Sequence, residues 1–315
     1  MEKIISSVSE QLFNQLMQLG YKPLKAEDYP VFQPYYDAMN EQYSSEISFL
    51  SMVTWSTSIF NFYKPMGDML CCLEYVSKEK YWTASPFIGH YSQQNVETAF
   101  RILRKDMQTL HLPLKIMDMS EWMFPFYQGI SGISWKVENL RDFMEYIYER
   151  EDFFKSMDSP DSRYRYRYFL RHFSPETVLL TSAHSEECTD YMKETWCPVR
   201  ECSDCCACPL EGVKTLLDAW DSLQANGILV RVNRKCAGFC IVSCQDGLGI
   251  YLFKHANNHM KGINEYLLRE CLTRFLPDVE RINYTADVGI EGLRAYKSKL
   301  APYTLSPCLI LYEEK

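Results

Sequence analysis

Residues 282–297 read INYTADVGIEGLRAYK, and this stretch says more about the fold than any other part of the chain. Its apolar start predicts a short strand, its polar middle a turn, and its remainder a helix. On that helix Arg294 and Lys297 are three positions apart, so both side chains can reach one place. Together with Asn283 and Asp287 they form a candidate site for an anion or an amide.

The residues around this stretch predict alternating helices and strands. The expected elements of the second half are helices at 211–225, 263–276 and 289–300 and strands at 228–232, 236–244, 249–254, 281–284 and 306–312. Short turns join the first three strands, which predicts antiparallel neighbours. The order helix, three-strand meander, helix, strand, helix, strand is that of the GNAT acyltransferase fold.

The first half echoes this order more weakly and contains no close sequence repeat. It predicts strands at 69–76, 80–86 and 114–117, and helices at 96–110 and 140–147. We therefore expect a mixed α/β fold (α+β, with mixed sheets) of two tandem GNAT-like domains. The polar stretch 156–162 is the expected boundary, which gives an N-terminal domain at 1–158 and a C-terminal domain at 159–315.

Composition limits the classes of function. The 315 residues carry a net charge of −8, which argues against general coating of DNA or RNA but not against a local basic groove. No apolar run approaches the roughly 20 residues of a membrane helix, and the N-terminus does not resemble a signal peptide. The 13 cysteines, an odd number, are expected to be reduced thiols. These features predict a cytoplasmic protein.

The opening stretch, closed by Pro302, resembles the closing motif of the phosphatidylglycerol lysyltransferase C-terminal family. That motif reads roughly I-N-x-x-x-D-x-G-x-x-G-L-R-x-x-K, followed by a proline. The matching positions are Ile282, Asn283, Asp287, Gly289, Gly292, Leu293, Arg294, Lys297 and Pro302. The chain departs at Tyr284, where members often carry Arg, and at Ala286, where a second Asp is common. The resemblance continues thinly through the first half, at 46–49 with Trp55, at Pro86 and at 146–148.

The resemblance implies transfer of an acyl or aminoacyl group to an amine or hydroxyl acceptor. The donor would be an acyl-CoA or an aminoacyl-tRNA. Catalysis would depend on positioning and on polarisation of the carbonyl rather than on a covalent intermediate. The alternative is a non-catalytic GNAT-fold module that binds a small anion or a peptide.

Three residues of the motif are candidates for catalysis. Asn283 is placed to hydrogen-bond an acyl or amide group, and Tyr296 to give a proton to a leaving group. Asp287 is expected to cap the following helix, with a role as general base as the alternative. Arg294 and Lys297 are expected to bind a substrate carboxylate or phosphate, or else to pair with surface neighbours.

Residues 163–168 read RYRYRY, and Arg171 follows. A helix that starts near Pro160 would align Arg163, Arg167 and Arg171 at four-residue spacing. Guanidinium groups bind phosphate or carboxylate, and the interleaved tyrosines can stack on a base. Arg167 also falls at the Arg of a basic motif in the resembled family, which makes it a candidate binding residue. The alternative is a solvated helix face with no ligand.

The segment between the third strand and the next helix is a candidate cofactor loop. In a GNAT fold the amides that open this helix hold the cofactor pyrophosphate. Lys261, Gly262 and Asn264 would lie there, and Lys254 matches a Lys of the resembled family at the end of the strand. The alternative is that Lys254 only ends an exposed strand and that Gly262 only caps a helix.

A cysteine cluster is a candidate metal site. Cys197, Cys202, Cys205 and Cys208 have gaps that allow thiolates to converge on one ion, which suggests a structural zinc or part of an iron–sulfur ligand set. The alternative is a reduced cysteine-rich loop.

Overall fold

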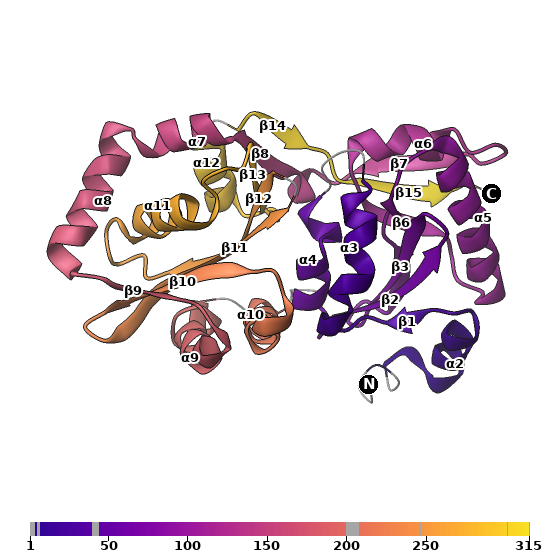
Figure 1. Ribbon diagram of the computed structural model, residues 1–315, viewed down its shortest axis with the longest axis horizontal. Helices are drawn as coiled ribbons and strands as arrows, with labels where there is room; N and C mark the ends of the chain where they lie inside the picture. Colours follow the sequence, from indigo (N-terminus) through magenta and orange to yellow (C-terminus); the bar gives the residue numbers. More distant parts are fainter. Residues whose placement is uncertain are drawn as a thin grey trace. The chain divides into compact units, whose positions relative to one another are not determined.

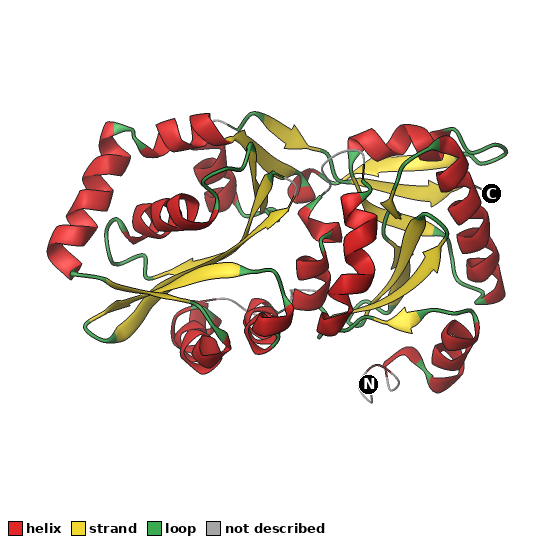
Figure 2. Cartoon of the chain, viewed as in Figure 1, coloured by secondary structure: helices red, strands yellow, loops and turns green. Residues whose placement is uncertain are grey.

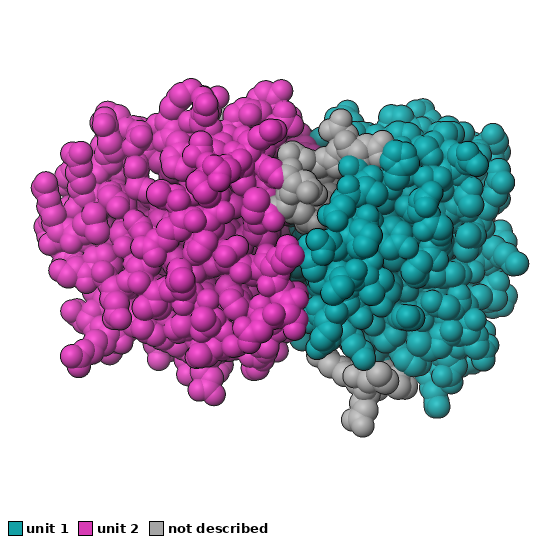
Figure 3. All heavy atoms as spheres, in the orientation of Figure 1, with its two compact units in different colours: residues 1–141, 206–208, 307–315 teal, residues 142–205, 209–306 magenta. Residues whose placement is uncertain are grey.

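The computed structural model describes residues 4, 7–39, 44–199, 208–245, 247–300 and 302–314. The chain divides into two compact units (Figure 3). Unit 1 comprises residues 1–141, 206–208 and 307–315, and unit 2 comprises residues 142–205 and 209–306. Each unit contains one mixed sheet with helices packed on it (Figure 2). Among the described residues, no helix combines the length and the apolar character that crossing a bilayer requires.

Unit 1 is built on an eight-stranded sheet. Its strands follow the order β1 (Lys22–Pro23), β2 (Ile59–Met66), β3 (Met69–Val76), β4 (Tyr81–Ala84), β6 (Lys115–Met119), β15 (Leu309–Glu313) and β7 (Trp135–Asn139), with β5 (Ile88–Gly89) paired to β3. Its helices include α2 (Glu10–Gln18), α3 (Tyr29–Asp37), α4 (Phe49–Thr54), α5 (Gln93–Thr109) and α6 (Phe124–Gln128). The Ser92 hydroxyl caps α5 by accepting from the Asn95 amide, and Val96, Phe100 and Leu103 form its buried face.

Unit 2 is built on a seven-stranded sheet. Its strands follow the order β14 (Thr304–Ser306), β8 (Glu145–Glu149), β13 (Arg281–Ala286), β12 (Leu248–Ala256), β11 (Lys235–Gln245), β10 (Asn226–Val232) and β9 (Glu176–Leu179). Its helices include α7 (Arg150–Met157), α8 (Pro160–Phe173), α9 (Ser185–Thr195), α10 (Pro209–Asp218), α11 (Ile263–Phe275) and α12 (Glu291–Lys299). Helix α11 covers one face of the sheet, and α9 and α10 cover the other (Figure 1).

The expected element order of the second half is confirmed from α10 through α12. Strands β10, β11 and β12 form an antiparallel meander, whereas β12 and β13 are parallel because α11 crosses between them. Tyr266, Leu267 and Cys271 of α11 belong to the same buried core as Ile282 and Tyr284 of β13. The expected mixed α/β class is therefore the observed one.

Two expected elements are wrong. Residues 140–147 do not form a helix: Arg141–Phe143 is a short 3-10 turn, and β8 follows it. The apolar spacing suggested a helix, but Tyr146 and Tyr148 pack into the core as alternate residues of a strand. The single strand expected at 306–312 is two strands, β14 and β15, which lie in different sheets.

The two sheets exchange strands along the chain. Strand β8 follows the first strands of unit 1 in the sequence, yet it lies between β14 and β13 in unit 2. Strand β15 comes last, yet it lies between β6 and β7 in unit 1. Each sheet is thus completed by a strand from a distant part of the chain, and the boundary expected after residue 158 stays a prediction.

Strands β6 and β13 occupy equivalent places in the two sheets. Strand β6 is parallel to β4 and antiparallel to β15, and β13 is parallel to β12 and antiparallel to β8. The antiparallel pairing of each is irregular, and each contains a residue in the left-handed region, Asp118 (φ 60°) in β6 and Thr285 (φ 56°) in β13. At the bulge in β13, the backbone carbonyls and the side chains that follow them in the sequence form a polar cluster in unit 2.

Candidate functional site

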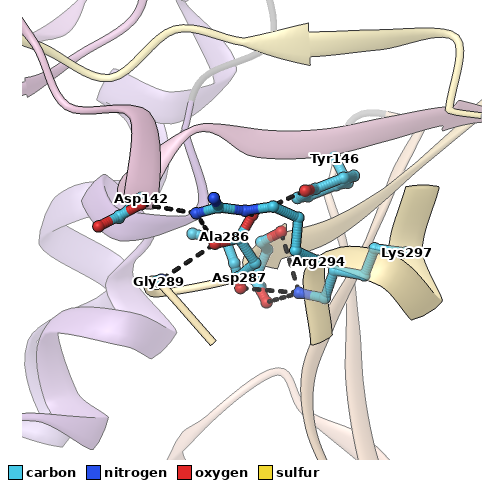
Figure 4. A network of polar contacts seen from close by, with 8 residues as sticks. Asp142, Tyr146, Ala286, Asp287, Gly289, Arg294 and Lys297 are labelled. Carbon is cyan, nitrogen blue, oxygen red and sulfur yellow. Dashed lines mark hydrogen bonds and ion pairs between the residues drawn. The ribbon is translucent and has the colours of Figure 1, made fainter. Parts of the chain in front are cut away.

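Lys297 of α12 holds the bulge of β13 from inside unit 2. Its Nζ donates to the carbonyl oxygens of Tyr284 at 2.6 Å and Thr285 at 3.2 Å. It also donates to that of Ala286 at 2.7 Å (Figure 4). The bulge removes these carbonyls from regular ladder pairing, and the ammonium group replaces the lost partners. The pKa of Lys297 is lowered to about 8, chiefly by burial; the charge of Asp287 opposes this shift, and the nearby Lys254 cation adds to it.

Asp287 is fully buried and accepts hydrogen bonds from three residues. Arg294 donates to both carboxylate oxygens, at 3.1 and 3.0 Å, Tyr146 Oη donates at 2.7 Å, and the Gly289 amide at 3.0 Å. Arg294 also donates to Asp142 at 2.7 Å (Figure 4). Burial alone would raise the pKa of Asp287, but these hydrogen bonds and the guanidinium charge outweigh it and hold the pKa below its usual range.

This environment decides what Asp287 can do chemically. A carboxylate with a depressed pKa is a weak base, so the geometry suits it to positioning Arg294 and the turn. The prediction that the Asp287 side chain caps α12 is wrong. Ile290 is the N-cap residue without a side-chain bond, and the Asp287 carboxylate instead accepts from Gly289, ahead of the helix.

Asn283 supplies a buried amide next to the bulge. Its side chain is inaccessible to solvent, and its Oδ1 accepts from the Thr285 amide at 2.8 Å, which stabilises the turn. Within the part of the chain that the structure describes, its Nδ2 has no hydrogen-bond partner. A buried amide donor left without a partner is costly, so this group is a natural point for a ligand oxygen.

Two tyrosine rings connect the bulge to Lys254 at the end of β12. The Lys254 Nζ lies 4.9 Å from the Tyr296 ring centre and 5.7 Å from that of Tyr284. Lys297 Nζ lies 5.1 Å from the Tyr284 ring centre, so this ring contacts two cations. An Arg in place of Tyr284, as is frequent in the resembled family, would put a third positive charge there.

The structure brings together six of the ten non-cysteine candidates and leaves four elsewhere. Around β13 and α12 lie Asn283, Asp287, Tyr296, Lys254, Arg294 and Lys297. Arg167 lies on the exposed side of α8, and Lys261 contacts the Tyr164 and Tyr168 rings of that helix. Asn264 donates to Asn258 at 2.9 Å in the loop before α11.

Gly262 lies beneath α8 rather than in an open loop. It is buried at the start of α11 with φ +93°, and a Cβ on it would lie 2.0 Å from the carbonyl oxygen of Arg165. The backbone of α8 therefore crosses directly over the beginning of α11, where a cofactor pyrophosphate was expected. A carbonyl oxygen at this place carries partial negative charge and repels an anion.

The candidate metal site can be followed only in part. Cys202 and Cys205 lie outside the described residues, while Cys197 and Cys208 are half-buried free thiols. Among the described residues, no group of three or more His, Cys, Asp and Glu side chains could hold a metal ion. A metal at this cluster stays a prediction.

Two further residues of the site come from β8 and the turn before it. Tyr146 binds Asp287, and Asp142 binds Arg294, across more than 140 residues of sequence. Tyr148 also donates to the carbonyl of Lys297 at 2.7 Å. The only sequence signal for the two tyrosines is the resemblance of residues 146–148 to the lysyltransferase family, which carries no information on what they contact, and no sequence signal points to Asp142.

The fold is found in several solved structures. A conserved protein of unknown function from Bacteroides thetaiotaomicron VPI-5482 matches with a TM-score of 0.82 and 17% identity, over 94% of this chain and 99% of that chain. FemX matches with a TM-score of 0.65 and 10% identity, over 93% and 97%. A tandem GNAT protein from the clavulanic acid biosynthesis pathway matches with a TM-score of 0.50 and 10% identity, over 93% and 98%.

These similarities establish a fold of two GNAT-like units. None of the curated proteins matches the sequence. The family model described as "Phosphatidylglycerol lysyltransferase, C-terminal" matches residues 38–312, which is most of the chain and includes every residue of the cluster at β13. The chain therefore belongs to the phosphatidylglycerol lysyltransferase C-terminal family.

Proposed function

We propose that unit 2 transfers an acyl or aminoacyl group from an activated donor to an amine or hydroxyl acceptor at the end of β13. The observation that carries this proposal is the cluster at the bulge. There the buried Asn283 amide has no partner among the described residues, and the half-buried Tyr296 phenol lies beside the Lys254 ammonium group. The family's name, which describes lysyl transfer, agrees with it.

The residues suggest a direct displacement. The acceptor nitrogen or oxygen attacks the donor carbonyl carbon, and the bond from that carbon to the leaving oxygen or sulfur breaks. The Asn283 Nδ2 donates to the carbonyl oxygen as negative charge develops on it. Tyr296 gives its proton to the leaving group, and Lys254 stabilises the resulting phenolate from 4.9 Å above the ring. The acceptor releases its own proton to solvent.

The covered start of α11 favours an aminoacyl-tRNA over an acyl-CoA as donor. The Arg165 carbonyl lies against Gly262, so the first turn of α11 is closed to the pyrophosphate of coenzyme A. An aminoacyl ester needs no pyrophosphate site. We propose that the reaction takes place in the cytoplasm, where charged tRNA is available.

Donor consumption by the purified protein tests this proposal. We expect release of the aminoacyl group from a set of charged tRNAs in the presence of amine acceptors, and no turnover of acyl-CoA. Tyr296→Phe and Lys254→Met are each expected to lower kcat by at least about tenfold with little change in KM, because proton transfer typically contributes 10²- to 10⁴-fold.

The control is Tyr303→Phe, which removes the hydroxyl of an exposed tyrosine in the same unit and is expected to leave the rate unchanged. If no donor is consumed and the Tyr296 and Lys254 variants bind small anions as wild type does, the chain is a non-catalytic binding module and the proposal fails.

A further inference from the structure

The sheet of unit 1 carries a buried polar row beneath α4. Asn61 on β2 and Thr83 on β4 both lie directly opposite Glu74 on β3 in the antiparallel register. The three side chains therefore share one face of the sheet, with neighbouring Cβ atoms about 5 Å apart, and all three are buried. The Asn61 Nδ2 donates to the Met52 carbonyl of α4 at 3.4 Å, which places the row under this helix (Figure 1).

Within the part of unit 1 that the structure describes, Glu74 is a buried carboxyl group without a hydrogen bond or an ion pair. Its exposed fraction is 9%. The protein pairs other buried acids: on the opposite face of the same sheet Asp106 accepts from Lys64 at 2.6 Å, and in unit 2 Asp287 accepts from Arg294 at 3.0 Å. A buried carboxyl group without such partners is costly, which sets Glu74 apart from these acids.

The neighbour of Glu74 on β2 also has an unused acceptor. The Asn61 side chain is 5% exposed, and its Nδ2 donates to two backbone carbonyls. Its Oδ1 is buried and has no hydrogen-bond partner among the described residues. Thr83 does not supply the missing donor, because its hydroxyl donates to the carbonyl of Lys115 at 3.1 Å. Two buried acceptors therefore lie side by side without a donor from the described chain.

Two further acids add negative charge and connect the row to solvent. Glu46, just before α4, and Asp118, the left-handed residue of β6, are half-buried. Burial, and then the charges of Asp118 and Glu46, raise the pKa of Glu74 well above its usual range. Among the described residues Lys115 forms no ion pair with these acids, and its Nζ lies 4.6 Å from the Tyr81 ring centre. The positive charge that would keep Glu74 ionised is therefore missing from the described part of the cluster.

We propose that this cluster of unit 1 binds the ammonium group of a small primary amine. An ammonium group has three N–H donors and no acceptor, so it can donate to the Glu74 carboxylate and to the Asn61 Oδ1 at once. The charges of Glu46 and Asp118 attract it, and the partial exposure of these two residues leaves room for the organic part of the amine. The inference goes beyond the transfer reaction, because the site is in unit 1 and the amine is bound without chemistry.

The arrangement of the acids favours an ammonium group over a metal ion. Calcium and magnesium bind six or more oxygen ligands at roughly 2.0 to 2.6 Å. Among the described residues, no group of three or more His, Cys, Asp and Glu side chains could hold such an ion. An ammonium group needs only two or three acceptors at hydrogen-bond distance, and Glu74 and Asn61 provide them.

Titration with n-butylammonium chloride at physiological ionic strength, followed by ligand-observed NMR, tests the proposal. Glu74→Gln keeps the shape of the side chain and removes its charge, and it is expected to bind the amine at least about tenfold more weakly. The variant E46Q/D118N is expected to bind about threefold more weakly, because it removes attraction and no direct hydrogen bond. Tetramethylammonium chloride has the same charge but no N–H donor, and it is expected not to compete.

The matched control is Glu79→Gln, the same substitution at an exposed residue of the turn between β3 and β4, which is expected to keep wild-type affinity. Thermal unfolding monitored by circular dichroism shows whether each variant is folded. If Glu74→Gln does not fold, E46Q/D118N decides the test, and an affinity equal to that of the wild type would then contradict the site.

Four results would overturn the proposal. The first is no amine binding by the wild type, which would mean that a proton on Glu74 satisfies Asn61 within the protein. The others are equal binding by the wild type and Glu74→Gln, competition by tetramethylammonium as strong as that by the amine, and binding of calcium in preference to the amine that depends on Glu74. Tyr296→Phe is expected to keep amine binding. A protein that binds the amine through Glu74 but transfers nothing would thus contradict only the proposed function.

Discussion

Lys297 is a buried ammonium group whose hydrogen-bond acceptors are mainly backbone carbonyls. Three consecutive carbonyls, from Tyr284 to Ala286, converge on its Nζ at the bulge of β13. Arg294, one turn earlier on α12, pairs with the carboxylates of Asp287 and Asp142. These two cations hold the site from within, whereas the proposed transfer uses the other groups of the cluster, Asn283, Lys254 and Tyr296.

The lowered pKa of Lys297 makes the free energy of unfolding of the wild type depend on pH, and a substitution at Lys297 removes this dependence. Burial lowers its pKa from 10.5 in the unfolded chain to about 8 in the folded one, so between these values the unfolded state binds the proton more tightly. The free energy of unfolding of the wild type is therefore expected to rise from pH 8 to 10, relative to Lys297→Met, by up to about 3 kcal/mol.

Urea denaturation of both proteins at pH 7.5, 8.5 and 9.5 measures this difference. Titration of other groups cancels because both proteins contain them. The exposed Lys214 of α10, replaced by Met, serves as the control and is expected to give curves parallel to wild type. Parallel curves for Lys297→Met would contradict the lowered pKa.

The residues that surround Asp287 show which parts of the site can be predicted from the sequence and which cannot. The turn and the helix of 282–297 could be predicted locally, and with them the closeness of Asp287 and Arg294. The places of Tyr146 and Asp142 could not be predicted, because these residues come close to Asp287 and Arg294 only through the antiparallel pairing of β8 with β13. No local pattern encodes which strand pairs with which. The unpaired Nδ2 of Asn283 is likewise a property of the packed site.

At the level of elements, the contact between α8 and α11 depends on one residue without a side chain. Gly262 opens α11 in the left-handed region, and the α8 backbone at Arg165 approaches it too closely for a Cβ. The same contact closes the first turn of α11, so the packing of the two helices is also the feature on which the proposed choice of donor rests.

Two glycine substitutions distinguish the effect of this close contact on stability from the effect of helix propensity. Gly262→Ala is expected to destabilise the protein by more than about 2 kcal/mol, since it adds left-handed strain to a backbone clash. Gly292→Ala, on α12 with open space around its Cβ, is expected to stabilise it by about 0.5 kcal/mol. Urea midpoints of both variants measure the effects, and a Gly262→Ala protein as stable as wild type would contradict the close approach.

Element prediction failed where pairing partners decide the structure. Residues 140–147 have apolar spacing close to a helix, yet β13 and β14 pair with 145–149 from both sides and hold it as a strand. Pro307 lies between β14 and β15, where the expected single strand is interrupted. Longer periodic segments, such as α5 and α11, were predicted within a few residues because one buried face determines them.

At the level of the whole molecule, the two units repeat one plan and exchange one strand each. Strands β6 and β13 occupy equivalent positions, with a left-handed residue at the irregular pairing of each. The strand next to β6 is β15 and the strand next to β13 is β8. Folding of either unit therefore requires parts of the chain that are far apart in sequence.

A chain cut between Asp158 and Ser159, at the predicted boundary, tests this dependence. The first fragment lacks β15, whose Leu309, Ile310 and Leu311 are buried in unit 1, and the second lacks β8 with the buried Tyr146 and Tyr148. Burial of three such aliphatic side chains is worth roughly 5 kcal/mol, which is comparable with the whole stability of a domain.

Each fragment alone is expected to lack cooperative unfolding and native near-UV circular dichroism, whereas the two coexpressed are expected to form a 1:1 complex with the spectrum of the intact protein. Removing only residues 314–315 is the control, because β15 ends at Glu313 and the sheet stays complete. A fragment that unfolds cooperatively by itself would mean that its unit tolerates the missing strand. Residue 158 would then mark a true domain boundary on that side of the cut, and the exchange would be a late addition to sheets that are already stable.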